Sequence, residues 1–279
     1  MKLGLALSGG GVRGAAHIGA IKALQENNIK IDAVAGTSAG SIIAALYTLG
    51  YTPEEMINLF NYFAKETMGI GPKNIYTGMK EKKGVKFGGL TSSLNIEKAI
   101  TELAMLKGIK NINEITTPIS ITTTDLLQNK EIVFTNNKYA EGDYYIKDIE
   151  IGKAVRASST FPGMYSPFEY NGFQFVDGGV FDNLPTAEAK YLGVDKILAI
   201  KFNWKTPRKQ NTIFNITMQS LDLMIEGLIR PSLELSDYVL DIRLKDVKPF
   251  SMKKINFCYE EGYKQTILQI NEIRKALNT

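Results

Sequence analysis

An α/β fold, in which helices flank a mostly parallel sheet, is the architecture that the sequence predicts. Strand-length apolar runs alternate with helix-length segments, glycine turns separate them, and the alternation continues for about 200 residues. The chain has 279 residues and a hydrophobic content of 44%, which suffices for a core in one large domain or two small ones. This composition excludes a mainly disordered chain, and we find no internal repeat.

The first strand and helix pairs set a pattern that the rest of the chain follows. Each predicted strand is a short apolar run bounded by glycine or polar residues, as in buried parallel strands. Thr52, Pro53 and Glu55 form a capping box that predicts the start of the third helix. The predicted strands cover 3–8, 31–35, 119–124, 131–135, 173–176 and 195–202, and the predicted helices 14–25, 41–49, 53–66, 95–106, 153–159, 183–192, 212–229 and 256–276.

The chain after residue 200 differs from the part before it. A basic polar stretch begins at Lys201, helix-like segments follow, and the whole net charge of +4 falls after residue 200. We expect residues 1–200 to form one domain and residues 201–279 to form a helical extension packed on that domain. Residues 69–93 collect glycines and lysines, which predicts a mobile loop or a lid.

The composition also limits the partners and cofactors. The one cysteine, Cys258, cannot form an internal disulfide, and together with the one histidine, His17, it cannot build a zinc site of Cys and His ligands. We expect no metal, no cofactor and, at a net charge of +4, no nucleic-acid partner. The N-terminal segment lacks the features of a signal peptide, and no window of about 18 residues is apolar throughout. We therefore expect a cytoplasmic protein, with peripheral membrane contact as a hypothesis and the oligomeric state open.

The second predicted strand runs into the second predicted helix through Gly36, Thr37, Ser38, Ala39 and Gly40. This G-x-S-x-G pattern is typical of a nucleophile elbow, a sharp turn that lifts a serine hydroxyl out of the sheet. Small residues are needed there because the turn strains the backbone and brings the helix close to the strand. The alternative is a tight turn whose Ser38 only caps the helix.

A glycine-rich loop joins the first predicted strand to the first predicted helix. It consists of Gly9, Gly10, Gly11, Val12, Arg13 and Gly14. Such a loop can direct backbone N–H groups at a phosphate or at the oxyanion of an acyl intermediate, next to the positive end of a helix. It also fits the dinucleotide pattern G-x-G-x-x-G, which calls for an acidic residue at the end of the second strand. The nearest acidic residue, Asp32, lies at the beginning of that strand instead.

A third motif, Asp177-Gly178-Gly179, ends a later predicted strand. Its glycines form a tight turn that would hold the carboxylate at the edge of the sheet, although a purely structural turn is the alternative. Asp182 is the competing carboxylate. It precedes Asn183 and a proline, which is typical of a helix start, so Asp177 is the better candidate.

A serine nucleophile needs a base, which in most serine hydrolases is histidine. His17 precedes Ser38 in the chain and shares a helix face with Ile21 and Leu24, which is typical of a packed core residue. The proton acceptor is then a carboxylate or a lysine, and Asp177 is suitable if it contacts Ser38 directly. A solvated aspartate is a weak base, but a water-poor pocket would raise its pKa.

The three motifs, in this order, resemble the patatin-like phospholipase family of lipid acyl hydrolases. The similarity extends to HIGAIKALQENNI and to residues 122–134 and 154–168, so it covers roughly the first 200 residues. The resemblance implies a three-layer α/β/α sandwich with residues 1–200 as a patatin-like catalytic domain. It also implies that Ser38 is the nucleophile, that Asp177 is its only catalytic partner and that the loop from Gly9 to Gly14 is the oxyanion hole of a calcium-independent esterase.

We therefore expect a serine lipid acyl hydrolase of the phospholipase A, lysophospholipase or esterase type, acting on glycerolipid or phospholipid esters. Hydrolysis and acyl transfer use the same residues, so both stay open. Two other classes are a catalytically silent lipid-binding or regulatory protein and a dinucleotide-binding oxidoreductase. Phe60, Phe63, Met68 and Trp204 stand near lysines or arginines, which suggests either a membrane-facing surface or an aromatic core face beside solvated lysines.

Overall fold

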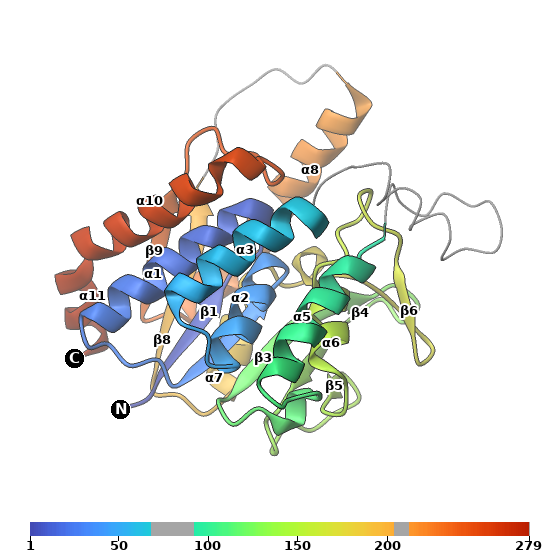
Figure 1. Cartoon of the computed structure of the whole chain (residues 1–279), viewed down its shortest axis with the longest axis horizontal. Helices are drawn as coiled ribbons and strands as arrows, with labels where there is room; N and C mark the ends of the chain where they lie inside the picture. The colour runs from blue at the N-terminus through green and yellow to red at the C-terminus, as the bar shows by residue number, and fades with distance from the viewer. Residues whose placement is uncertain (68–91, 204–211, 279) are drawn as a thin grey trace.

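The computed structural model describes residues 1–67, 92–203 and 212–278. Within this part of the chain, helices flank one nine-stranded, mostly parallel sheet (Figure 1). The main strand order is β5-β4-β3-β2-β1-β8-β9, and β6 and β7 form a hairpin that joins β3 through β7. The strands are β1 (Leu3–Leu7), β2 (Ala33–Thr37), β3 (Ile119–Asp125), β4 (Lys130–Thr135), β5 (Tyr145–Ile146), β6 (Phe168–Tyr170), β7 (Phe173–Asp177), β8 (Lys196–Asn203) and β9 (Tyr238–Arg243).

Side-chain alternation along the buried central strands builds the layers on the two faces of the sheet. In β1, Leu5 and Leu7 belong to the larger core cluster, whereas Ala6 between them belongs to a smaller one. Helices α1, α3 and α10 lie side by side over the larger core (Figure 1), and α7 packs on the smaller one. The helices are α1 (Ala15–Glu26), α2 (Ala39–Thr48), α3 (Pro53–Thr67), α5 (Leu94–Leu106), α6 (Ile151–Ser158), α7 (Thr186–Tyr191), α8 (Ile213–Leu228), α9 (Arg230–Glu234), α10 (Ile255–Leu268) and α11 (Ile270–Leu277). This arrangement confirms the predicted α/β/α fold class.

The region after residue 203 contains the predicted helices and one strand that the sequence analysis missed. Strand β9 pairs in parallel with β8 and extends the sheet by one strand. Its alternate residues Leu240 and Ile242 are buried. The single helix predicted over 256–276 is divided at Gln269 into α10 and α11. The C-terminal region therefore completes the sheet as well as covering it.

For Phe60, the structure decides between the membrane-facing surface and the aromatic core face in favour of the core. Phe60 on α3 is only 3% exposed and belongs to the larger core cluster, because α3 packs this face against α1. The side chain of Phe63, residues Met68 and Trp204, and residues 69–91 of the expected lid lie outside the described part of the chain. The capping box at the start of α3 is confirmed: the Thr52 N–H donates to Glu55 Oε2 at 2.7 Å, and the Glu55 N–H donates to Thr52 Oγ1 at 3.2 Å.

Strand β3 has one edge that two other strands share. Residues 119–122 of β3 pair in parallel with β2, whose last residue Thr37 lies opposite Thr122. Residues 123–125 pair in antiparallel fashion with β7, whose last residue Asp177 lies opposite Thr123. The opposite edge of β3 is occupied by β4. β2 and β7 thus meet end to end on the same edge of β3, where β2 leaves the sheet and β7 takes its place.

Candidate active site

Ser38 occupies the turn at which β2 ends and α2 begins. Its backbone has φ 53° and ψ −120°, a strained conformation for a residue with a side chain, and its hydroxyl makes no capping bond to α2. Ser38 is half-buried, which leaves the side chain partly accessible. These features are those of a nucleophile elbow, and they exclude the alternative in which Ser38 only caps the helix.

Two serines at the end of α6 support the strained turn. The Ser38 N–H donates to Ser158 Oγ at 2.8 Å, and the Ser159 hydroxyl donates to the Ser38 carbonyl at 3.3 Å. Sequence reasoning assigned these serines no role, although they lie within the 154–168 stretch that carried the family resemblance. The N–H and the carbonyl group of Ser38 are therefore both held by serine side chains at the end of α6.

The elbow glycines are required because backbone groups approach them closely. A Cβ added to Gly36 would lie 2.6 Å from the carbonyl carbon of Gly40, and one added to Gly40 would lie 2.7 Å from the carbonyl carbon of Leu7. Both distances are far below a normal van der Waals contact. The start of α2 can thus pack directly on β1 and β2 only with glycine at these positions.

Asp177 lies at the end of β7, beside the point where β2 gives way to Ser38. Its side chain is 2% exposed, and Oδ1 accepts the Gly179 N–H at 2.8 Å, which is the turn expected of the Asp-Gly-Gly motif. Burial raises the pKa of Asp177 to about 6, while the nearby Ser38 side chain and the bond from the Gly179 N–H oppose that rise. No hydrogen bond of standard geometry reaches Oδ2 from the described residues. The Ser38 hydroxyl therefore lies close to Asp177 without a short, aligned bond, which is common before substrate binds.

The Asp182 carboxylate lies among other acidic side chains. Its backbone carbonyl accepts the Thr37 hydroxyl at 2.9 Å, whereas its side chain lies near the carboxylates of Glu131 and Glu188. We call these three residues the acidic cluster. Asp182 Oδ1 accepts the Leu184 N–H at 3.0 Å, and α7 begins at Thr186, three residues later than predicted. Asp182 thus supports the elbow through its backbone, while Asp177 is the carboxylate beside Ser38.

Some backbone N–H groups of the expected oxyanion loop already donate hydrogen bonds within the protein, and those groups are not available to bind an oxyanion. The Gly9 N–H donates to the Asn183 carbonyl at 3.2 Å, and the Val12 N–H donates to the Pro249 carbonyl at 2.8 Å. Within the described residues, no hydrogen bond uses the N–H groups of Gly10 or Gly11. Those two half-buried glycines precede α1 and carry the loop's open donors.

Arg13 fixes the shape of this loop from within the protein. The guanidinium Nε donates to the Gly10 carbonyl at 2.8 Å, and the residue is 2% exposed. Burial lowers the Arg13 pKa to about 10, partly offset by the nearby Asp222 and Cys258. Arg13 stays charged at neutral pH, and its side chain holds the Gly10 peptide in place.

His17 is a core residue, as predicted. It is fully buried, its Nε2 lies 2.8 Å from the Ser8 carbonyl, and its ring packs on Phe202 with 4.5 Å between centroids. Burial lowers its pKa to about 4, so the ring is neutral at physiological pH and donates its Nε2 proton to Ser8. This hydrogen bond holds Ser8, which follows β1, in place just before the glycine loop.

The Asp32 carboxylate, the candidate ribose ligand of a dinucleotide site, already binds groups of the protein, which argues against that site. The carboxylate accepts the Leu3 N–H at 2.9 Å and pairs with Lys30 at 2.7 Å, before β2 begins.

Among the described residues, no cluster of His, Cys, Asp or Glu is arranged to bind a metal ion. In that same part of the chain, every helix is too short or too polar to span a bilayer.

The comparisons with known proteins agree with this geometry. Residues 5–190 match the family model described as patatin-like phospholipase. The chain belongs to the patatin-like phospholipase family. Its match includes the elbow, the glycine loop and the Asp-Gly-Gly turn.

Three relatives illustrate the range of this family. The probable lipid hydrolase 463L of Invertebrate iridescent virus 6 is 33% identical over 222 residues, which cover 76% of this chain and 69% of the viral protein. An uncharacterized NTE family protein of Mycobacterium bovis is 28% identical over 81% of this chain. Lysophospholipase NTE1 of Meyerozyma guilliermondii is 29% identical over 71% of this chain but only 12% of its own length. The match covers 56% of the mycobacterial relative, so the chain corresponds to about half of that protein.

Solved structures share the fold at low sequence identity. VipD from Legionella pneumophila superposes with a TM-score of 0.56 at 16% identity, over 97% of this chain and 67% of VipD. Human GIVD cytosolic phospholipase A2, in complex with a fluorophosphonate, superposes with a TM-score of 0.53 at 12% identity, over 99% of this chain and 58% of that chain. These similarities confirm the predicted architecture.

Proposed function

We propose that this chain hydrolyses acyl esters of glycerolipids, with Ser38 as nucleophile and Asp177 as its catalytic partner. The observation that carries the proposal is the junction on β3, where the strained serine follows the end of β2 and the buried aspartate ends β7. The neutral, buried His17 is committed to the Ser8 carbonyl, which supports a base other than histidine. Lysophospholipids are the substrate class that we favour, because fungal relatives are named lysophospholipases.

In the acylation step, Ser38 Oγ attacks the ester carbonyl carbon and gives its proton to Asp177 Oδ2. Oδ1 already accepts the Gly179 N–H, so Oδ2 is the oxygen that remains for this proton. The tetrahedral oxyanion is bound by the N–H groups of Gly10 and Gly11, each worth about 3 kcal/mol in the transition state. When the carbon–oxygen bond breaks, the leaving alcohol takes the proton from Asp177, and the acyl group remains on Ser38.

Deacylation repeats these steps with water. Asp177 takes a proton from a water molecule, whose oxygen attacks the acyl carbon, and the same amides hold the second oxyanion. The fatty acid then leaves while Ser38 Oγ regains a proton from Asp177. The raised pKa of Asp177, about 6, makes the carboxylate a better base than a solvated aspartate while it stays ionised at neutral pH.

Labelling with a fluorophosphonate probe, followed by peptide mapping, tests the assignment. We expect the adduct on Ser38, and we expect Ser38→Ala and Asp177→Asn each to lower hydrolysis of a soluble nitrophenyl ester by at least ~1,000-fold. Asp182→Asn is the matched carboxylate control and should retain most of the activity, because that side chain belongs to the acidic cluster. An adduct on another serine, or full activity in Asp177→Asn, would reject the dyad.

A further inference from the structure

Helix α8 places its charged side chains toward the protein and exposes several of its large apolar side chains to solvent. The exposed positions recur with helical spacing and include Ile216, Leu223, Met224 and Leu228. Leu221, Asp222, Ile225 and Glu226 are half-buried on the opposite face. A surface helix of a globular protein normally buries its apolar stripe and exposes its charges. α8 shows the reverse for its charged residues, and it extends outward from the rest of the molecule (Figure 1).

The charged face of α8 is paired with buried cations. Asp222 lies near the Arg13 guanidinium and raises its pKa, and Glu226 Oε1 lies 4.0 Å from Lys201 Nζ. Lys201 is 9% exposed and also pairs with Asp241 at 3.1 Å. Arg13 in turn holds the Gly10 carbonyl of the glycine loop. These contacts place the inner face of α8 beside the candidate oxyanion donors.

Four large apolar side chains of α8 are about half exposed or more. We call Ile216, Leu223, Met224 and Leu228 the outer stripe, and their side chains are 50%, 55%, 65% and 49% exposed. Leu223, Met224 and Leu228 lie within two turns of one another, and Ile216 follows on the same side two turns toward the N-terminus. A patch of this kind on a helix is typical of a segment that lies in the boundary between water and a lipid layer.

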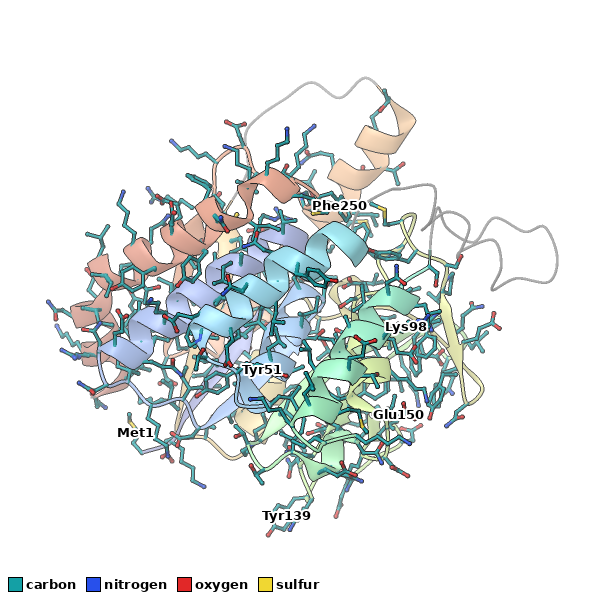
Figure 2. The ribbon with its side chains drawn as sticks, in the orientation of Figure 1. Met1, Tyr51, Lys98, Tyr139, Glu150 and Phe250 are labelled. Carbon is teal, nitrogen blue, oxygen red and sulfur yellow. The ribbon has the colours of Figure 1, made fainter. Side chains whose placement is uncertain are left out.

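Basic and aromatic groups border α8 at the same end of the molecule. Asp222 of α8 and Cys258 near the start of α10 both lie within electrostatic range of the Arg13 guanidinium, so the two helices approach the same buried group. Next to Cys258, Phe257 is 39% exposed, and Lys254 Nζ lies 5.1 Å from its ring centroid. In the view of Figure 2, Phe250 lies at this same end. Because aromatic and cationic side chains prefer the headgroup region, this border fits an anionic lipid surface.

We propose that the outer stripe of α8 docks on the surface of an anionic lipid bilayer. Docking there would hold the lipid surface one helix diameter, ~10 Å, from Arg13 and the glycine loop, so that an ester could pass from the bilayer to Ser38. This benefit rests on the proposed hydrolase function, whereas the docking itself does not. A lipid surface fits better than a second copy of the chain, because α8 lies beside the candidate site and the net charge of +4 falls after residue 200.

Vesicle co-sedimentation tests the proposal with the double variant Leu223→Gln/Met224→Gln. The vesicles contain equal parts of phosphatidylcholine and phosphatidylglycerol. We expect vesicle affinity to fall by at least ~10-fold, since two large apolar contacts with lipid are lost. The double variant Leu106→Gln/Leu268→Gln is the matched control, because both leucines are more than 70% exposed on other helices, at 79% and 72%. The control should change vesicle affinity by less than ~2-fold.

Two further measurements separate a loss of docking from misfolding and from failure of the hydrolase proposal. Both double variants should hydrolyse a soluble nitrophenyl ester at the rate of the unaltered chain. That result would show that they fold and that the site is intact. Ser38→Ala should bind vesicles like the unaltered chain, so failure of the hydrolase proposal and failure of docking are distinguishable. Unchanged vesicle binding in the α8 variant would overturn docking. A change of oligomeric state in that variant, seen by sedimentation velocity, would overturn it too, because the stripe would then contact a second copy.

Discussion

The Asp177 carboxyl owes its chemistry to its surroundings. It is 2% exposed, and burial disfavours its ionised form, which raises its pKa to about 6. The proposed mechanism needs the ionised carboxylate as proton acceptor. Activity should therefore depend on whether this one group has lost its proton.

We expect kcat/KM for a soluble ester to rise about tenfold per pH unit below pH 5 and to level off above pH 7. The sign follows from the proposed role, because a base is inactive when protonated and Asp177 is protonated below about pH 6. The measurement is a pH–rate profile between pH 4.5 and 8.5, with circular dichroism at each pH to confirm folding. A flat profile between pH 5 and 7 would contradict the role of Asp177.

Single residues can be proposed from the sequence where a motif demands a particular side chain. Ser38 and Asp177 were chosen from the elbow and from the Asp-Gly-Gly turn, and the exclusion of His17 followed from its helical spacing. Ser158 and Ser159 were not recognised as supports of the elbow, because their role depends on the position of α6. The sequence carries no local signal for a hydrogen bond across about 120 residues.

At the level of elements, the start of α2 depends on a backbone contact that tolerates no side chain. Gly36→Ala should lower the free energy of unfolding by roughly 2 kcal/mol or more, because its Cβ would lie 2.6 Å from the Gly40 carbonyl carbon. Gly227→Ala in α8 is the matched control, since a Cβ there meets nothing within 4 Å. That control should stabilise the helix by roughly 0.5–1 kcal/mol. Urea unfolding checks both, and equal effects of the two substitutions would contradict the contact.

Most elements were predicted because apolar periodicity reports burial directly. The parallel strands β1, β2 and β8 are apolar runs, and α3 begins at its capping box as expected. β9 was missed because it is a half-buried edge strand that contains Asp241 and follows polar residues, so its alternation is short and weak. The pairing of β7 with β3 was also beyond prediction, since strand order depends on contacts between distant segments.

For the whole molecule, the acidic cluster makes stability depend on pH. Glu131, Asp182 and Glu188 have pKa values raised by burial to about 8, 6 and 7. A carboxyl whose pKa is higher in the folded state binds its proton more tightly there, so folding is favoured at low pH. Stability should decrease as pH rises from the unfolded pKa values, 3.8 for the aspartate and 4.5 for the glutamates, through about 8.

Glu131→Gln tests this dependence without a change of shape. At pH 8 we expect the variant to exceed the unaltered chain in free energy of unfolding by roughly 2 kcal/mol, and at pH 5 the two should nearly coincide. Glu102→Gln, on an exposed face of α5, is the control and should be neutral at both values. Urea titrations at the two pH values give the comparison. If the unaltered chain and Glu131→Gln lost the same stability between pH 5 and pH 8, the acidic cluster would not be the cause of the pH dependence.

The end-to-end meeting of β2 and β7 also bears on how relatives of this chain are assigned an activity. Neighbouring side chains of a strand point to opposite faces, so a one-residue insertion or deletion in β7 would turn the carboxylate of Asp177 toward the opposite layer. The Asp125 carboxylate binds the Gln174 N–H at 2.9 Å and fixes the present alignment. A homologue with every motif letter intact but an altered spacing between these positions should be classed as inactive, and letter-based searches alone would not detect that loss.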